Sequence, residues 1–143
     1  MTAHTRLALR LTPQRRAVLE ALRASHDHPT AAELLSRVQQ RSPGVGPATV
    51  YRTLGLLVRS GLAIEVNIGD GGGARYDGNT GPHDHLVCTR CRRVVDIVQP
   101  RPDLSGVAGT GFAVTGYDLL VYGICPDCQE RWGTADAEET YPC

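Results

Sequence analysis

The sequence predicts an α+β fold, in which three helices and a short β-hairpin precede a smaller α/β half. Over the first 61 residues, apolar side chains recur at the spacing of amphipathic helices. From Leu62 onward the apolar side chains alternate, as is typical of half-buried strands. Two Cys-x-x-Cys pairs mark the second half. The 143 residues suffice for one domain or two very small ones, and a half of about 70 residues has a marginal core without a metal or a partner subunit.

Capping residues predict the ends of the three helices. The dipeptide Thr12-Pro13 supplies an N-cap and a proline at the first helical position. Thr30 and Glu33 have the spacing of a capping box, which opens the second helix. Gly46-Pro47 opens the third helix, and Gly61 ends it. The inner faces of these helices are apolar, with Val18, Leu19 and Leu22 on the first, Leu34, Leu35 and Val38 on the second, and Val50, Leu54 and Leu57 on the third.

A hairpin follows the helices. Leu62–Ile68 reads as a half-buried strand, residues 69–73 as a glycine-rich loop, and Ala74–Tyr76 as the returning strand. Three helices followed by such a hairpin predict a winged helix-turn-helix domain over residues 1–78. Residues 79–82 include glycine and proline and predict a hinge.

Residues 83–132 are expected to form a separate α/β domain. Its strand candidates are His85–Cys88, Val94–Val98 and Leu119–Ile124. Pro102–Gly111 can form a short helix, although its three glycines disfavour one. Residues 133–143 are polar and acidic, and we expect a disordered tail there.

The charge is unevenly distributed although the formal net charge is zero. Residues 1–81 carry ten arginines against six acidic residues, whereas residues 82–143 carry five against nine. A basic first half suits a polyanion, since arginine binds phosphate and guanine edges well; the alternative is a solvated surface with random asymmetry. No run approaches 18 apolar residues, and Met1–Arg10 lacks the apolar stretch of a signal peptide. We therefore expect a cytoplasmic protein that does not enter a membrane.

The third helix has the features of a DNA-reading helix. With its apolar face turned inward, Thr49, Arg52 and Thr53 are expected to face outward, with Tyr51 at the edge of that face. Arginine can hold guanine by two acceptors, and a tyrosine ring can contact a thymine methyl group or a phosphate. Arginines at or before the first helix are candidates for phosphate contacts, namely Arg10, Arg15 and Arg16. The alternative is a solvated amphipathic helix, which the hairpin and the basic first half disfavour.

The four paired cysteines predict a structural zinc site. Each Cys-x-x-Cys pair can place two thiolates on one ion, so Cys88, Cys91, Cys125 and Cys128 complete a tetrahedron with no open position. The alternative, buried or redox-active thiols, requires two matched pairs by chance. Cys143 lies outside the pairs, and five cysteines in a chain expected to be cytoplasmic argue against a disulfide framework.

Histidines and aspartates predict a second metal site of different chemistry. His83 and His85 share one face of an extended strand, so both imidazoles can reach one ion. Asp77 precedes them and Asp96 follows, while His28 lies before the second helix and by itself is better explained as a loop histidine. Nitrogen with carboxylate oxygen suits Fe²⁺, Mn²⁺ or Zn²⁺.

These motifs together resemble the ferric uptake regulator family over nearly the whole chain, from about Arg10 to Cys128. The segments that carry the resemblance are Leu11-Thr12-Pro13-Gln14-Arg15, His28-Pro29-Thr30-Ala31, Ala48-Thr49-Val50-Tyr51-Arg52-Thr53-Leu54, His83-Asp84-His85-Leu86-Val87-Cys88-x-x-Cys91, and Tyr122-Gly123-Ile124-Cys125-Pro126-Asp127-Cys128. The family consists of homodimeric repressors with a winged-helix front and an α/β dimerisation rear. The resemblance therefore implies binding to double-stranded operator DNA with an inverted repeat, and a regulatory ion that holds the two halves closed.

Within the family, the ligand set His28, Asp77, His83, His85 and Asp96 is similar to that of the peroxide-sensing, PerR-like members. Iron-uptake regulators usually have glutamate at the position of Asp77 and often at that of Asp96. The resemblance implies that bound Fe²⁺ reacts with peroxide and that a ligating histidine, His28 or His83, is oxidised. Residues 112–120 lack the histidine and glutamate of a further family metal site, so we expect no third site.

Three alternatives stay open at this point. A regulator of iron, manganese or zinc supply would use the same ligands without a peroxide response. A non-haem iron enzyme would use His83, His85 and a carboxylate as a facial triad, but it would leave the first half without a role. A zinc-ribbon interaction module would explain the cysteines but not the histidines. The sequence favours a metal-dependent repressor that is not an enzyme.

Overall fold

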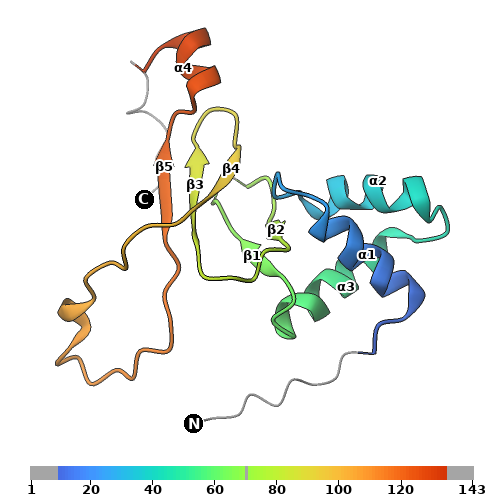
Figure 1. Cartoon of the computed structure of the whole chain (residues 1–143), viewed down its shortest axis with the longest axis horizontal. Helices are drawn as coiled ribbons and strands as arrows, with labels where there is room; N and C mark the ends of the chain where they lie inside the picture. The colour runs from blue at the N-terminus through green and yellow to red at the C-terminus, as the bar shows by residue number, and fades with distance from the viewer. Residues whose placement is uncertain (1–9, 70, 135–143) are drawn as a thin grey trace. The chain divides into compact units, whose positions relative to one another are not determined.

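The structure is a computed structural model, and it describes residues 10–69 and 71–134 (Figure 1). Cys143 and nearly all of the tail expected at 133–143 lie outside the described residues. The chain divides into two compact units, Met1–Gly81 and Pro82–Cys143. Helices, a two-stranded sheet and a three-stranded sheet confirm the α+β prediction.

The first unit is built on three helices, α1 (Pro13–Arg23), α2 (Ala31–Arg41) and α3 (Pro47–Arg59). Thr12 caps α1 by accepting a hydrogen bond from the Arg15 amide at 3.3 Å. Thr30 and Glu33 form the expected capping box at the start of α2. Apolar residues from the three helices, from the connection between α2 and α3 and from the segment after α3 form one core, namely Val18, Leu19, Leu22, Ala31, Leu34, Val38, Val45, Val50, Leu54, Leu57 and Ala63.

The hairpin of the first unit joins β1 (Ile64–Val66) and β2 (Arg75–Asp77) in antiparallel pairing. The connection between α1 and α2 also pairs with β2, through a bridge between Thr30 and Arg75. The Tyr76 amide donates to the Pro29 carbonyl at 2.9 Å in the same pairing. Both β1 and the distant connection between α1 and α2 thus pair with β2.

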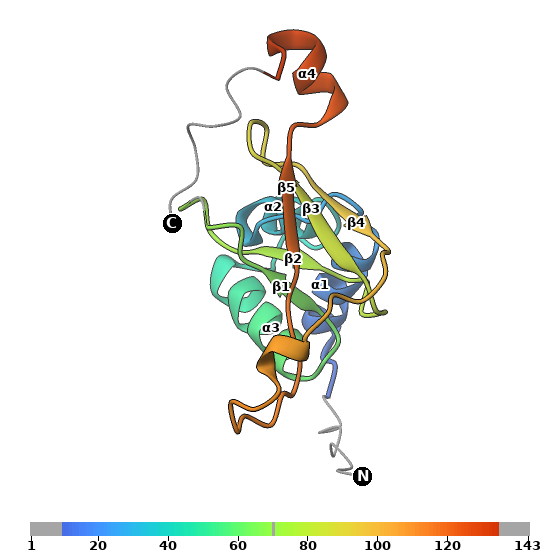
Figure 2. The same cartoon turned by 90° about the vertical axis from the view of Figure 1, so that its left-hand side faces the viewer.

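The second unit contains a three-stranded sheet in the order β4-β3-β5. The central strand β3 (Asp84–Cys88) is antiparallel to β4 (Val94–Ile97) and parallel to β5 (Leu120–Gly123). A short helix, α4 (Pro126–Trp132), follows the end of β5 (Figure 2). This helix was not predicted, although Pro126 at its start and Asp127 in its first turn are helix signals.

The helix considered at Pro102–Gly111 is reduced to a 3₁₀ turn, η1, at Ser105–Val107. Gly109 and Gly111 take positive φ angles of 88° and 80°, which a right-handed helix does not contain. Among the described residues, no helix is long and apolar enough to cross a lipid bilayer.

Candidate metal centres and nucleic-acid interface

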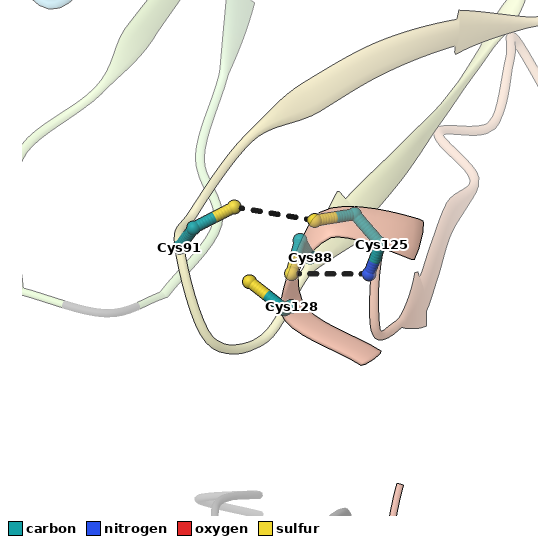
Figure 3. Close-up of side chains that lie close together, drawn as sticks. All are labelled: Cys88, Cys91, Cys125 and Cys128. Carbon is teal, nitrogen blue, oxygen red and sulfur yellow. Dashed lines mark hydrogen bonds between the residues drawn. The ribbon is translucent and has the colours of Figure 1, made fainter. Parts of the chain in front are cut away.

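The four paired cysteines converge at one end of the three-stranded sheet (Figure 3). Cys88 ends β3, Cys91 lies in the turn toward β4, Cys125 caps α4, and Cys128 lies in its first turn. All four sulfur atoms lie within 4.8 Å of one another, and the Sγ atoms of Cys91 and Cys125 are 3.7 Å apart. Four ligands about 2.3 Å from a tetrahedral Zn²⁺ are about 3.8 Å apart, so the spacing fits zinc.

Pairing within the sheet brings the two Cys-x-x-Cys segments together. β3 and β5 align Cys88 with Gly123, and the Thr89 amide donates to the Gly123 carbonyl at 2.9 Å. Arg93 and Asp127 form an ion pair of 2.7 Å between the two segments. The sulfur positions are therefore set by the fold of this unit.

The electrostatics of the four thiols also suit a cation. Burial raises the pKa of Cys88, but amide donors from Cys125, Cys91 and Arg90 outweigh it and lower this pKa from 9.0 to about 6. Burial and hydrogen bonds with the other three thiols raise the pKa of Cys128 to about 12. The backbone thus stabilises one thiolate, and a bound divalent cation would supply the charge that stabilises the others.

The first unit brings His28 and Asp77 together. His28 Nε2 lies 3.3 Å from Asp77 Oδ2, and both side chains are buried. The other carboxylate oxygen of Asp77 accepts a hydrogen bond from the Asn79 amide at 2.8 Å, which fixes the carboxylate. His28 has a φ of 54°, in the left-handed region that few residues other than glycine adopt. A buried imidazole and carboxylate facing each other can supply two ligands.

The glycine after Asp77 is required by close packing. A Cβ atom at Gly78 would lie 3.1 Å from Arg23 Cα and 3.2 Å from the Leu22 carbonyl oxygen, at the end of α1. This contact could not be predicted from the sequence, because it depends on the tertiary fold.

The second unit brings His83, His85 and Asp96 together. The Nε2 atoms of His83 and His85 are 3.1 Å apart, and they lie 3.4 Å and 3.6 Å from Asp96 Oδ1. Pairing of β3 with β4 places His85 opposite Asp96. Adjacent ligands about 2.1 Å from an octahedral ion are about 3.0 Å apart, so these three atoms can occupy adjacent positions around one ion.

The exposed side of α3 carries most of the residues expected to read DNA. Tyr51 and Arg52 are exposed and Thr49 is half-buried, whereas Val50, Leu54 and Leu57 are buried. The expectation for Thr53 is wrong, since it is only 2% exposed. Positions 50, 53, 54 and 57 follow the i, i+3, i+4, i+7 pattern and therefore share the inner face.

The arginines around the start of α1 differ in exposure. Arg10 and Arg16 are exposed, while Arg15 is half-buried and donates from Nη1 to the Arg10 carbonyl at 3.0 Å. This bond ties the segment before α1 to the first turn of the helix.

Comparisons with known proteins identify the family of this chain. Residues 6–122 match the ferric uptake regulator family. The peroxide-responsive repressor PerR of Staphylococcus epidermidis is 36% identical over 126 residues, which cover 86% of this chain and 83% of that protein. The solved structure of the Campylobacter jejuni peroxide stress regulator is 28% identical, with a TM-score of 0.66, over 81% of this chain and 89% of that one. The ferric uptake regulator from Pseudomonas aeruginosa with manganese is 26% identical, with a TM-score of 0.63, over 82% and 91%. The chain therefore belongs to the ferric uptake regulator family.

Proposed function

We propose that this protein is a homodimeric repressor that binds inverted-repeat operator DNA in the cytoplasm and senses hydrogen peroxide through a bound iron. The observation that carries the proposal is the pair of nitrogen and oxygen ligand clusters, His28 with Asp77 and His83 with His85 and Asp96. Both carboxylates are aspartates, as in the peroxide-sensing members that the chain resembles. The kinship with PerR of S. epidermidis supports the same assignment.

In this proposal the four cysteines hold a structural Zn²⁺. Four sulfur ligands leave no open position for a substrate, so the ion stabilises the fold of residues 83–132 and takes no part in sensing. The free energy of zinc binding adds most to the folding stability of a domain whose own hydrophobic core is small.

The two ligand clusters are proposed to share one regulatory ion, Fe²⁺ or Mn²⁺. The first offers two ligands and the second three, so neither alone fills an octahedral shell, and together they leave one position open. One cluster belongs to the domain proposed for residues 1–78 and the other to residues 83–132, with 79–82 as the hinge. An ion held by both favours one closed arrangement, and this differential binding would make it a corepressor.

Dimerisation is proposed to occur through the rear domain. Leu86 is aligned with Val95 on one neighbouring strand and with Val121 on the other, and these three side chains are 36%, 45% and 36% exposed. A row of apolar side chains across a sheet favours burial against another subunit. A two-fold dimer would place two α3 helices on two half-sites, which requires an inverted repeat.

DNA recognition is assigned to α3 and the start of α1. Arg52 and Tyr51, with Thr49 beside them, are proposed to contact bases in the major groove. Arg10, Arg15 and Arg16 are proposed to contact phosphates, which adds affinity without sequence preference.

Peroxide sensing is assigned to the open position of the regulatory site. Fe²⁺ held by these residues would supply the electron that cleaves the O–O bond of peroxide, with one oxygen then added to an imidazole and the other leaving as water, whereas Mn²⁺ would do so poorly. Oxidation of a ligating imidazole, His28 or His83, removes a donor and thereby weakens the hold of the two domains on the ion. The ion then no longer stabilises the closed, DNA-binding form relative to the open form, and the operator is released.

The test uses the operator DNA upstream of the protein's own coding region and the full-length zinc protein, loaded with Fe²⁺ or Mn²⁺. We expect both forms to bind, and only the Fe²⁺ form to release DNA on addition of peroxide. Mass spectrometry should show a gain of about 16 Da, one oxygen atom, on His28 or His83. The exposed His26 is an internal control and should stay unmodified. Retention of DNA by the Fe²⁺ form, with both histidines intact, would replace this function with sensing of metal supply.

A further inference from the structure

The backbone around His28 is held in an unfavourable conformation. His28 has a φ of 54°, and the connection between α1 and α2 that carries it has no regular secondary structure of its own beyond its bridge to β2. Left-handed backbone at a residue with a Cβ persists only when surrounding contacts fix it. The contacts that fix this one come from two arginines of the first unit, Arg75 and Arg37.

Arg75 contacts this backbone directly. Its Nη1 donates to the His28 carbonyl at 3.3 Å and lies 3.9 Å from Glu33 Oε2, and its side chain is only 18% exposed. The backbone of Arg75 also bridges to Thr30, two residues after His28. Arg75 thus holds the end of this connection on the strand that carries Asp77.

Arg37 holds the start of the same connection. From α2, its Nη1 donates to Ser25 Oγ at 2.8 Å and to Asp27 Oδ1 at 2.7 Å, and its Nη2 donates to Asp27 Oδ2 at 2.6 Å. Such a two-pronged contact restricts orientation more than a single ion pair does. Ser25 Oγ in turn donates to the Ala21 carbonyl of α1 at 2.8 Å. Arg37 therefore holds residues just before His28, and Arg75 holds the carbonyl of His28 itself.

We propose that Arg37 and Arg75 are positioning residues that preset His28 beside Asp77 before any metal binds. This inference rests on the proposed function, in which His28 and Asp77 are metal ligands. A connection that samples other conformations would bind metal only in the fraction of molecules with His28 in place, and the apparent dissociation constant would be the intrinsic one divided by that fraction. The contacts of Arg37 and Arg75, which together form a clamp on this connection, keep that fraction high in the metal-free protein.

The experiment measures two quantities on the full-length zinc protein: Mn²⁺ affinity, and hydrogen exchange of residues 25–30 without Mn²⁺. The variants are Arg75→Met and Arg37→Met, which keep chain length but remove the donors. Arg41→Met is the matched control, because Arg41 is an exposed arginine at the end of the same helix as Arg37. Arg75→Lys keeps one charged donor for the His28 carbonyl and should restore part of the affinity.

We expect each Met variant to raise the Mn²⁺ dissociation constant about tenfold, or about 1.4 kcal/mol at 25 °C. Exchange of residues 25–30 should become faster in the metal-free protein, while Arg41→Met changes neither quantity more than about twofold. Unchanged affinity and exchange in folded Arg75→Met and Arg37→Met proteins overturn the clamp. If a Met variant does not fold, Arg37→Lys and Arg75→Lys give the same two readouts.

His28→Ala separates failure of the clamp from failure of the proposed site. If His28→Ala lowers Mn²⁺ affinity and the arginine variants do not, the site stands and the clamp is refuted. If His28→Ala leaves Mn²⁺ affinity unchanged, the proposed site is refuted. Exchange of residues 25–30 then still decides whether the two arginines hold the connection.

Discussion

Replacing Gly78 with alanine should destabilise the first unit through one added methyl group. The added Cβ would lie 3.1 Å from Arg23 Cα, 3.2 Å from Arg23 N and 3.2 Å from the Leu22 carbonyl oxygen. All three neighbours are backbone atoms of α1, which cannot move aside as a flexible side chain can. Inserting a methyl group into such close packing costs about 1–3 kcal/mol. Reduced freedom of the unfolded chain offsets about 0.4–1 kcal/mol of that.

The midpoints of these two ranges give an expected net loss of about 1.3 kcal/mol, with the packing cost larger than the entropic gain. Urea denaturation of the full-length zinc protein measures it as a lower midpoint. Gly44→Ala is the matched control, because no atom lies within 4 Å of the Cβ position there. The same chemical change should leave Gly44→Ala as stable as the wild type or slightly more so. Equal midpoints for the two variants would refute the packing argument.

Further predictions concern the zinc site, DNA contacts and the regulatory site. Cys88→Ser should lose both zinc and the dimer, by metal analysis and sedimentation, whereas Cys143→Ser should keep both; a stable zinc-free dimer would contradict the structural role. Arg52→Ala should weaken binding to a fluorescent operator duplex by about 1–3 kcal/mol and relax base preference. Arg15→Ala should weaken all duplexes alike and reduce the salt slope by about 1, and an operator-specific loss would argue against a phosphate contact. Asp77→Glu should keep Mn²⁺-dependent DNA binding but reduce histidine oxidation seen by mass spectrometry, because the longer carboxylate alters access to the open position; undiminished oxidation would count against this account.

Local signals in the sequence predicted much of the fold. Thr12 and Thr30 act within three residues of themselves, and both form the hydrogen bonds that their spacing predicts. The Cys-x-x-Cys spacing constrains two sulfur atoms at a time, and the four cysteines do converge. Thr53 was expected to face outward, but it lies three residues after the buried Val50 and therefore on the inner face of the helix.

Features set by long-range packing could not be predicted. The contact of Arg75 with the His28 carbonyl joins residues 47 positions apart, and no spacing rule reports it. The left-handed backbone of His28 is likewise imposed by its neighbours, because histidine itself prefers other regions. The tight fit of Gly78 against α1 is a property of the assembled unit.

The parallel pairing of β3 with β5 has a consequence for the order in which the chain can fold during synthesis. All elements of the first unit lie within its first 81 residues, so they can assemble as soon as that stretch has left the ribosome. The sheet of the second unit cannot be completed until β5 emerges, and its last paired cysteine, Cys128, comes later still. Until then Cys88 and Cys91 have no second pair with which to share a zinc ion. We therefore expect the nascent protein to pass through a stage in which a finished first unit is followed by an unfolded chain that carries two reduced thiols.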